Sequence, residues 1–158
     1  MIQGLTNDYV EKLCKKILIN QKFYGVYPCD IQPKLSRKNK IFSIIFNTGD
    51  SSTPGEHFIA LYFTPRSVFY FDSFGKKPLD QNIKLFINRN IDRRKLVCFD
   101  RKIQSDHSSF CGFFCTAFLL SKDRKITAFN RYFSKNDLDK NNQKTVYFII
   151  KYMNNKCI

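Results

Sequence analysis

Apolar and polar positions along the chain follow helical spacing in some segments and strand-like spacing in others. Residues 9–18 carry apolar side chains three and four positions apart. The segment Thr6-Asn7-Asp8 supplies capping side chains before them, so we predict a helix there. Residues 41–46 form a run rich in Ile and Phe that is typical of a strand. The polar residues 47–55 then predict a long loop.

A predicted hairpin follows this loop. From His57 to Phe63 the side chains are almost all apolar or aromatic, which indicates a mostly buried strand. Residues 64–67 predict a turn, because Pro65 presets its own φ angle and has no N–H to donate to a sheet. Residues 68–72 are predicted to form the returning strand, about 4.8 Å from the first, as in antiparallel neighbours.

Further helices are predicted toward the end of the chain. The residues after Cys111, up to position 120, are apolar on all sides, as in a buried helix, and polar residues 105–109 form the loop that enters it. Another helix is predicted over residues 144–153. The sequence has no repeat and no linker. We therefore predict one α+β domain over residues 1–158, with a central, mostly antiparallel sheet packed against helices and Cys111 at the N-terminus of a buried helix.

Several chemically reactive side chains belong to these elements. His57 begins one strand of the hairpin and Asp72 ends the other, so the carboxylate can hold the imidazole tautomer and stabilise its protonated form. Cys111 lies near a helix start, which favours a thiolate, and Gly112 is expected to leave room for substrate beside the sulfur. The backbone N–H near Cys111 and the Gln104 amide are candidate oxyanion donors. Together these groups predict a cysteine protease.

The order of these residues resembles the adenovirus maturation protease family, adenain, in the wider clan that includes proteases for ubiquitin-like modifiers. Papain-like enzymes place the cysteine first, whereas here the order is histidine, acid, glutamine, cysteine. Asp72 stands where the family carries Glu, and Phe58 stands where a Trp often follows the histidine. The stretches that carry the resemblance are His57 with Pro65-Arg66-Ser67, Phe71-Asp72-Ser73-Phe74-Gly75, Gln104 before Cys111-Gly112-Phe113-Phe114-Cys115, and the segments 23–27 and 44–49.

The resemblance implies an adenain-like cysteine protease fold and a viral or virus-derived endopeptidase that cleaves virion or capsid precursor proteins during maturation. It implies that Cys111 is the nucleophile, His57 the base, Asp72 its orienting acid and Gln104 part of the oxyanion hole. An isopeptidase or protease acting on ubiquitin-like modifiers is the alternative within the clan. A non-catalytic, basic, DNA-binding virion protein is the alternative from another class.

The charge of the chain is strongly positive, since 27 Lys and Arg against 13 Asp and Glu give a net charge of +14. Such an excess attracts nucleic acid without sequence preference, although composition alone can also produce it. The resemblance implies DNA as a cofactor and an activating peptide that pairs through a thiol, for which Cys98 is the nearest candidate. Arg93, Arg94 and Lys95 are candidate DNA contacts. The other basic clusters are Arg37-Lys38-Asn39-Lys40, Lys76-Lys77, Arg101-Lys102 and Arg124-Lys125.

We expect no small-molecule cofactor and no metal. His107, Cys111 and Cys115 recur at intervals of four and could be zinc ligands, but structural zinc normally uses two ligand pairs. With no secretion signal, the six cysteines are expected to be reduced, and Cys115 to be a small buried apolar residue. No segment approaches the roughly 20 apolar residues of a membrane span. We expect a soluble, intracellular monomer, in the host nucleus or the virion if the source is viral.

Overall fold

The structure, a computed structural model, describes residues 5–36, 40–53, 56–121 and 126–155. Its centre is a five-stranded sheet in the order β1-β2-β3-β4-β5. The strands are β1 (Phe23–Pro28), β2 (Phe42–Asn47), β3 (Phe58–Phe63), β4 (Ser67–Phe71) and β5 (Lys95–Cys98). The helices are α1 (Asn7–Ile17), α2 (Gln81–Asn90), α3 (Cys111–Leu120), α4 (Ile126–Tyr132) and α5 (Asp139–Asn154).

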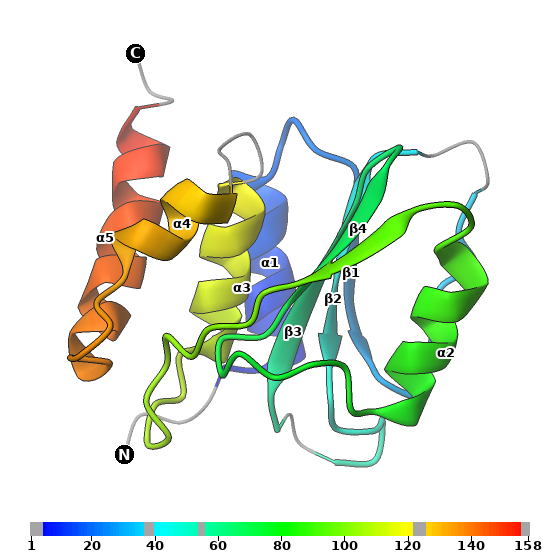
Figure 1. Cartoon of the computed structure of the whole chain (residues 1–158), viewed down its shortest axis with the longest axis horizontal. Helices are drawn as coiled ribbons and strands as arrows, with labels where there is room; N and C mark the ends of the chain where they lie inside the picture. The colour runs from blue at the N-terminus through cyan, green and yellow to red at the C-terminus, as the bar shows by residue number, and fades with distance from the viewer. Residues whose placement is uncertain (1–4, 37–39, 54–55, 122–125, 156–158) are drawn as a thin grey trace.

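Helices cover both faces of the sheet (Figure 1). α1 and α3 lie against one face, with α4 and α5 beyond α3, and α2 lies against the other face. Each face has its own core. Phe58 and Ala60 of β3 belong to the core shared with α1 and α3, whereas Ile59 and Leu61 belong to the core shared with α2. β3 is therefore buried on both faces, as its continuous apolar run predicted.

The sheet is mixed. β2 pairs with β3 and β3 with β4 in antiparallel fashion, so the predicted hairpin is present, with Ala60 opposite Phe71. β1–β2 and β4–β5 are parallel. Each parallel pair is joined by a long connection, residues 29–41 in one case and residues 72–94 with α2 in the other, because parallel neighbours require a crossover. The α+β class and the antiparallel centre are confirmed, while the parallel outer pairs and α2 were not predicted.

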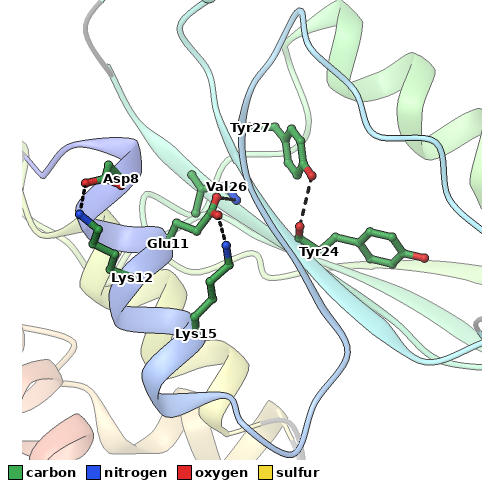
Figure 2. Close-up of polar contacts among 7 residues, drawn as sticks. All are labelled: Asp8, Glu11, Lys12, Lys15, Tyr24, Val26 and Tyr27. Atoms are coloured by element: carbon green, nitrogen blue, oxygen red, sulfur yellow. Dashed lines mark hydrogen bonds and ion pairs between the residues drawn. The ribbon is translucent and has the colours of Figure 1, made fainter.

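A part-buried carboxylate ties α1 to β1 (Figure 2). Glu11 Oε2 accepts the N–H of Val26 at 2.9 Å, and Lys15 pairs with Glu11 Oε1. Burial raises the pKa of Glu11, but the bonds from Lys15 and Val26 outweigh it and lower the pKa from its usual value. Gly25 has a φ of +130°, and a Cβ there would lie 3.1 Å from Glu11 Oε2, so glycine permits this close contact.

The three predicted helices are confirmed as α1, α3 and α5. The Oγ1 of Thr6 accepts the N–H of Tyr9 at 3.2 Å and so caps α1. Every residue of α3 from Phe114 to Leu120 is buried, which explains why this helix is apolar on all sides. Among the described residues, no helix is long and apolar enough to cross a membrane.

Candidate active site

His57 and Asp72 lie side by side at one end of the hairpin. His57 comes immediately before β3 and Asp72 immediately after β4. The Nε2 of His57 lies 2.9 Å from Asp72 Oδ1, and the same oxygen accepts the N–H of Phe74 at 2.8 Å. The Asp72 side chain is 5% exposed and that of His57 is 16% exposed. The hairpin therefore brings the two predicted residues together and leaves the imidazole partly accessible.

An aromatic ring covers the imidazole. The Phe74 ring lies 4.8 Å from the His57 ring, centroid to centroid, at an interplanar angle of 31°. The ammonium groups of Lys76 and Lys102 lie 5.6 Å and 5.9 Å from the centroid of the same Phe74 ring. Phe58, which follows His57 directly, is buried in the core with α1 and α3. Phe74, two residues after the acid, is thus the aromatic residue in contact with the base.

Cys111 is the first residue of α3 and is 7% exposed. Phe110 at the N-cap position offers no side-chain hydrogen bond to the helix, so no cap competes for the N–H groups of the first turn. Such groups stabilise a thiolate and can donate to an oxyanion. The side chain of Cys111 lies close enough to His57 to raise the pKa of the imidazole.

The contacts of His57 favour its charged form. Burial lowers the pKa of His57, whereas its hydrogen bonds to Asp72 and Cys111, and the charges of these groups, raise it to about 9. These contacts therefore favour the protonated imidazole. A protonated imidazole beside a cysteine sulfur favours the thiolate, and it holds the proton that a leaving amine needs.

The Gln104 side chain is buried, at 1% exposure, beside the loop that enters α3. Ser73 Oγ donates to Gln104 Oε1 at 2.6 Å, and Gln104 Nε2 donates to the carbonyl oxygen of Ser108 at 2.6 Å. An amide nitrogen carries two hydrogens, so one N–H of Gln104 is left over for another acceptor. The structure therefore places this amide against the segment that leads to Cys111.

Gly112 faces α1 and not a substrate, which corrects the prediction that it leaves room beside the sulfur. A Cβ at Gly112 would lie 2.7 Å from Val10 Cγ2 and 3.0 Å from Leu5 Cδ1. These distances are shorter than side chains tolerate without movement. In the same interface Cys14 Sγ lies 3.3 Å from Thr116 Oγ1. Gly112 therefore allows α1 to pack closely on the first turn of α3.

The other described thiols are less suited to nucleophilic attack. Cys115 is fully buried, and burial raises its pKa well above the usual value. Burial also raises the pKa of Cys14 to about 12. The prediction that Cys115 is a small buried apolar residue is confirmed. The described cysteines are all free, namely Cys14, Cys29, Cys98, Cys111 and Cys115, and Cys157 lies outside the described residues.

The arrangement around His107 gives no support to the zinc alternative. His107 is exposed in the turn before α3, so it does not share a helix face with Cys111 and Cys115. Within the described ranges there is no group of three His, Cys, Asp or Glu side chains that could hold a metal ion.

The candidate DNA contacts lie at the far end of α2 and differ among themselves. Arg93 and Lys95 are exposed, and no acid within the described part of the chain forms an ion pair with either. Arg94 instead folds inward. Its Nε donates to the carbonyl oxygen of Thr64 at 2.7 Å and its Nη1 to that of Asn90 at 3.0 Å. Arg94 therefore ties the hairpin turn to the end of α2.

A groove of about 890 Å³ lies beside this end of α2. None of the four predicted catalytic residues lines it. The basic segments 37–39 and 124–125 lie outside the described residues. The charged residues that line the groove are Lys40, Arg89, Arg93 and Arg94, with Asp92 as an acid among them.

Cys98, the candidate thiol for an activating peptide, is the last residue of β5 and is partly buried. Burial raises the pKa of Cys98, the charge of Lys77 lowers it, and Asp100 raises it further, so that the net shift is upward. β5 is one of the two edge strands of the sheet. Cys98 is therefore at an edge where another segment can approach, but its thiol is not activated.

Ser73, Phe74 and Ser108 were not predicted as part of the site. Each contacts a predicted residue: Ser73 and Ser108 hold the Gln104 amide, and Phe74 contacts both Asp72 and His57. Ser73 and Phe74 follow the acid directly in sequence, which is the one signal that could have drawn attention to them. Nothing in the sequence around Ser108 indicates its contact.

Known proteins resemble this chain over most of its length. A family model described as Adenovirus endoprotease matches residues 23–146. The Protease of Avian adenovirus 8 (strain ATCC A-2A) is 30% identical over 139 residues, which cover 80% of this chain and 67% of that protein. The Protease of Bovine adenovirus 7 is 30% identical over 132 residues, 75% of this chain and 64% of that protein. This chain therefore spans about two thirds of the length of these relatives.

Solved structures share the fold. The crystal structure of the ASFV pS273R protease, in its Se-Met form, matches with a TM-score of 0.62 at 16% sequence identity, over 90% of this chain and 66% of that chain. A second crystal structure of the ASFV pS273R protease matches with a TM-score of 0.60. The predicted fold class is confirmed by this likeness.

Proposed function

This chain belongs to the adenovirus endoprotease family, and from this premise we propose that it is a cysteine endopeptidase with Cys111 as nucleophile. The observation that carries the proposal is the position of His57, whose Nε2 lies 2.9 Å from Asp72 Oδ1 and whose pKa is raised by Cys111 at the start of α3. The family predicted from the sequence is confirmed. The roles of the individual residues are our proposal.

The first step of the proposed reaction is attack by the Cys111 sulfur on the carbonyl carbon of the scissile bond. His57 holds the proton taken from the thiol, and Asp72 keeps the imidazole oriented and stabilises its charge. As the sulfur–carbon bond forms, the carbonyl electron pair moves to the oxygen. The backbone N–H of Cys111 and the free N–H of Gln104 donate to this oxyanion.

The second half of the reaction regenerates the thiol. The tetrahedral intermediate collapses, the carbon–nitrogen bond breaks, and the leaving amine takes the proton from His57. The acyl group remains on Cys111 as a thioester. A water molecule then attacks this thioester while His57 removes its proton, and the proton returns to the sulfur as the product acid leaves. One water is consumed in each turnover.

Replacement of the nucleophile tests the proposal. Cys111→Ala should abolish peptide cleavage, because it removes the sulfur that lies near His57. Cys115→Ala, one helical turn further along α3, is the matched control and should keep most of the activity. Alkylation at neutral pH should label Cys111 ahead of Cys14 and Cys115, whose pKa values are raised by burial. Unchanged cleavage by Cys111→Ala would falsify the mechanism.

We propose viral structural precursor proteins as substrates and the host nucleus or the virion as the place of action. The support is that the relatives are adenovirus proteins named Protease. Peptides that span cleavage sites of virion precursors should be cleaved, and fusions to ubiquitin-like modifiers should not. The reverse result would favour the isopeptidase alternative. Failure to cleave either substrate would favour the non-catalytic, DNA-binding alternative.

We also propose that DNA binds in the groove beside α2 and stimulates cleavage. The support is the net charge of +14 and the exposed Arg89 and Arg93, which form no ion pair within the described residues. Affinity for duplex DNA of any sequence should fall with log salt at a slope of about 0.9 for each phosphate contacted. Arg94 is unsuitable for a test because its guanidinium holds the hairpin turn.

The charge reversals Arg89→Glu and Arg93→Glu should together weaken DNA binding and reduce the salt slope by about 2, because two phosphate contacts are lost. The control reverses Lys16 and Lys151, exposed residues of α1 and α5, and makes the same change in net charge. If DNA affinity falls equally in both double variants, the net charge attracts DNA and the groove is not a specific binding site. DNA as a cofactor is excluded if duplex DNA neither binds at low salt nor alters hydrolysis.

We propose, finally, that a monomer is activated by a short peptide that forms a disulfide with Cys98. The support is the position of Cys98 at the end of the edge strand β5 and its partial exposure. A synthetic capsid peptide whose one cysteine is supplied as a disulfide with a small thiol should exchange with Cys98 of the wild-type protein and release that small thiol, and it should not react in this way with Cys98→Ser. Labelling that persists in Cys98→Ser would assign the pairing to another thiol.

The proposal that the protein is a monomer has a separate test. In analytical ultracentrifugation, the protein should sediment with the mass of one chain.

A further inference from the structure

We propose that Ser73 is a positioning residue for the Gln104 amide, so that one short turn holds both the acid that orients His57 and the donor for the oxyanion. This inference rests on the proposed function, because it assigns Ser73 to the same reaction. Ser73 lies directly between Asp72 and Phe74 and is fully buried. Its side chain contacts neither the nucleophile nor the base in the bonds described above, so its effect passes through Gln104.

Three hydrogen bonds connect Ser73 with the segment that carries Gln104. The carbonyl oxygen of Ser73 accepts the N–H of Ile103 at 2.9 Å and the N–H of Gln104 at 3.1 Å. These two bonds hold the main chain, and they do not depend on the side chain at position 73. The third bond runs from the Ser73 hydroxyl to Gln104 Oε1 at 2.6 Å. The side chain of Ser73 therefore contributes one separable contact, to the amide itself.

The chemistry of the two partners sets the direction of the Gln104 amide. The carbonyl oxygen of Ser108 can only accept, so it must face the Nε2 of Gln104. Oε1 then faces Ser73, whose hydroxyl can donate. Because the Gln104 side chain is 1% exposed, water does not readily replace a lost partner. The bond to Oε1 also polarises the amide and makes its remaining N–H a stronger donor.

The turn that contains Ser73 holds the other half of the site as well. Asp72 Oδ1 accepts from His57 and from the N–H of Phe74, and the N–H of Gly75 donates to the Asp72 carbonyl at 2.9 Å. Gly75 has a φ of +70°, and a Cβ there would lie 2.6 Å from the carbonyl carbon of Arg101. Glycine therefore lets the turn pack directly on the chain that leads to Gln104.

Kinetics of Ser73→Ala test the inference, because this change keeps the backbone bonds and removes the hydroxyl alone. We expect kcat to fall about tenfold and KM to change less than about twofold, since an oxyanion forms only after binding. The matched control is Ser121→Ala at the other end of α3, which removes another buried serine hydroxyl, bonded to the Phe118 carbonyl at 2.7 Å. This control should have the kcat of the wild-type protein.

A double-mutant cycle distinguishes positioning from a general structural role. In a Gln104→Ala background, Ser73→Ala should change kcat less than about twofold, because the amide that it positions is absent. A further tenfold loss in that background would overturn the inference, since Ser73 would then act independently of Gln104. If Gln104→Ala alone keeps the full kcat, the oxyanion role in the proposed function fails, and the role of Ser73 in catalysis fails with it.

A measurement that needs no activity completes the test. The side-chain amide protons of Gln104, observed by ¹⁵N NMR, should exchange with solvent at least about tenfold faster in Ser73→Ala than in the wild-type protein. Backbone signals of α3 should stay in place. Unchanged exchange of the Gln104 amide would overturn the inference even if the wild-type protein cleaves every substrate tested. It would leave the nucleophile and the base of the proposed function untouched.

Discussion

The proton-transfer half of the site and its oxyanion half are held by different kinds of structure. His57 and Asp72 flank a hairpin whose main-chain pairing fixes their separation. Gln104 lies in the irregular segment between β5 and α3, and side-chain bonds to Ser73 and Ser108 hold its amide. The first half should therefore tolerate changes to nearby side chains, whereas the second half should respond to the loss of a single hydroxyl.

Among changes that keep the nucleophile, the largest effect is expected from Asp72→Asn, which leaves the hairpin intact and removes the charge that orients the base. We expect kcat to fall about 100- to 1000-fold, because an amide neither stabilises the imidazolium nor selects its tautomer. The hairpin should still form, since the backbone ladder is unaffected, but the midpoint of thermal unfolding at neutral pH should fall, because the pairing of His57 with Asp72 is lost. A loss of less than about threefold would mean that the hairpin geometry alone orients His57.

The second largest effect is expected from Gln104→Ala. Loss of one oxyanion donor should lower kcat about 100-fold, while the rate at which iodoacetamide alkylates Cys111 should stay unchanged. Alkylation reports the thiolate and therefore only the proton-transfer half. If alkylation slows in parallel with kcat, Gln104 acts on the sulfur, and the division of the site into two halves is incorrect.

The hairpin half could be predicted from the sequence because local patterns specify it. The apolar run from His57 to Phe63 and the turn at Pro65 determine the register that places His57 beside Asp72. Cys111 was placed correctly because a polar loop changes there into a helix that is apolar on all sides. Both the hairpin and the start of this helix are specified by residues that are close in sequence, so local backbone preferences are enough to predict them.

Most of the features that the sequence did not reveal depend on segments distant in the chain. Gly112 faces Val10, which lies on another helix, so its partner could not be inferred from its neighbours. Ser73 and Phe74 matter because the segment before α3 folds back on the turn after β4. β5 was missed because it is short, and Lys95 and Leu96 are exposed, so no alternation marks it as a strand.

The pH dependence should also separate the two halves. Because the pKa of His57 is about 9, kcat/KM should fall about tenfold per pH unit above pH 9, where His57 loses its proton. Asp72→Asn should move this limb to lower pH, since the bond to Asp72 raises the pKa of His57. Gln104→Ala should leave the limb in place, and a shift in that variant would contradict the comparison.

Stability should follow the same titration. The folded-state pKa of His57 lies above the usual 6.5, so the folded protein binds this proton more tightly than the unfolded chain does. The contribution to the free energy of unfolding is complete below pH 6.5 and is lost as pH rises through about 9. Urea unfolding between pH 6 and 10 measures the loss. In Asp72→Asn the free energy of unfolding should decrease less between these pH values than in the wild-type protein. In Gln104→Ala it should decrease as much as in the wild-type protein.

The smallest effect is expected from Phe74→Leu, which removes the ring whose centroid lies 4.8 Å from that of His57. An aromatic face stabilises a nearby cation by about 0.5 to 1 kcal/mol at a partly exposed site, so kcat/KM should fall about two- to fivefold at neutral pH. The fall of kcat/KM at alkaline pH should begin at a pH that is lower by less than one unit. Phe74→Tyr keeps the ring and is the control, and both variants keep the backbone N–H that binds Asp72. If kcat/KM falls as much in Phe74→Tyr as in Phe74→Leu, the contribution of Phe74 is its packing in the turn after Asp72. The ring would then support both halves of the site, and it would have no separate role in proton transfer.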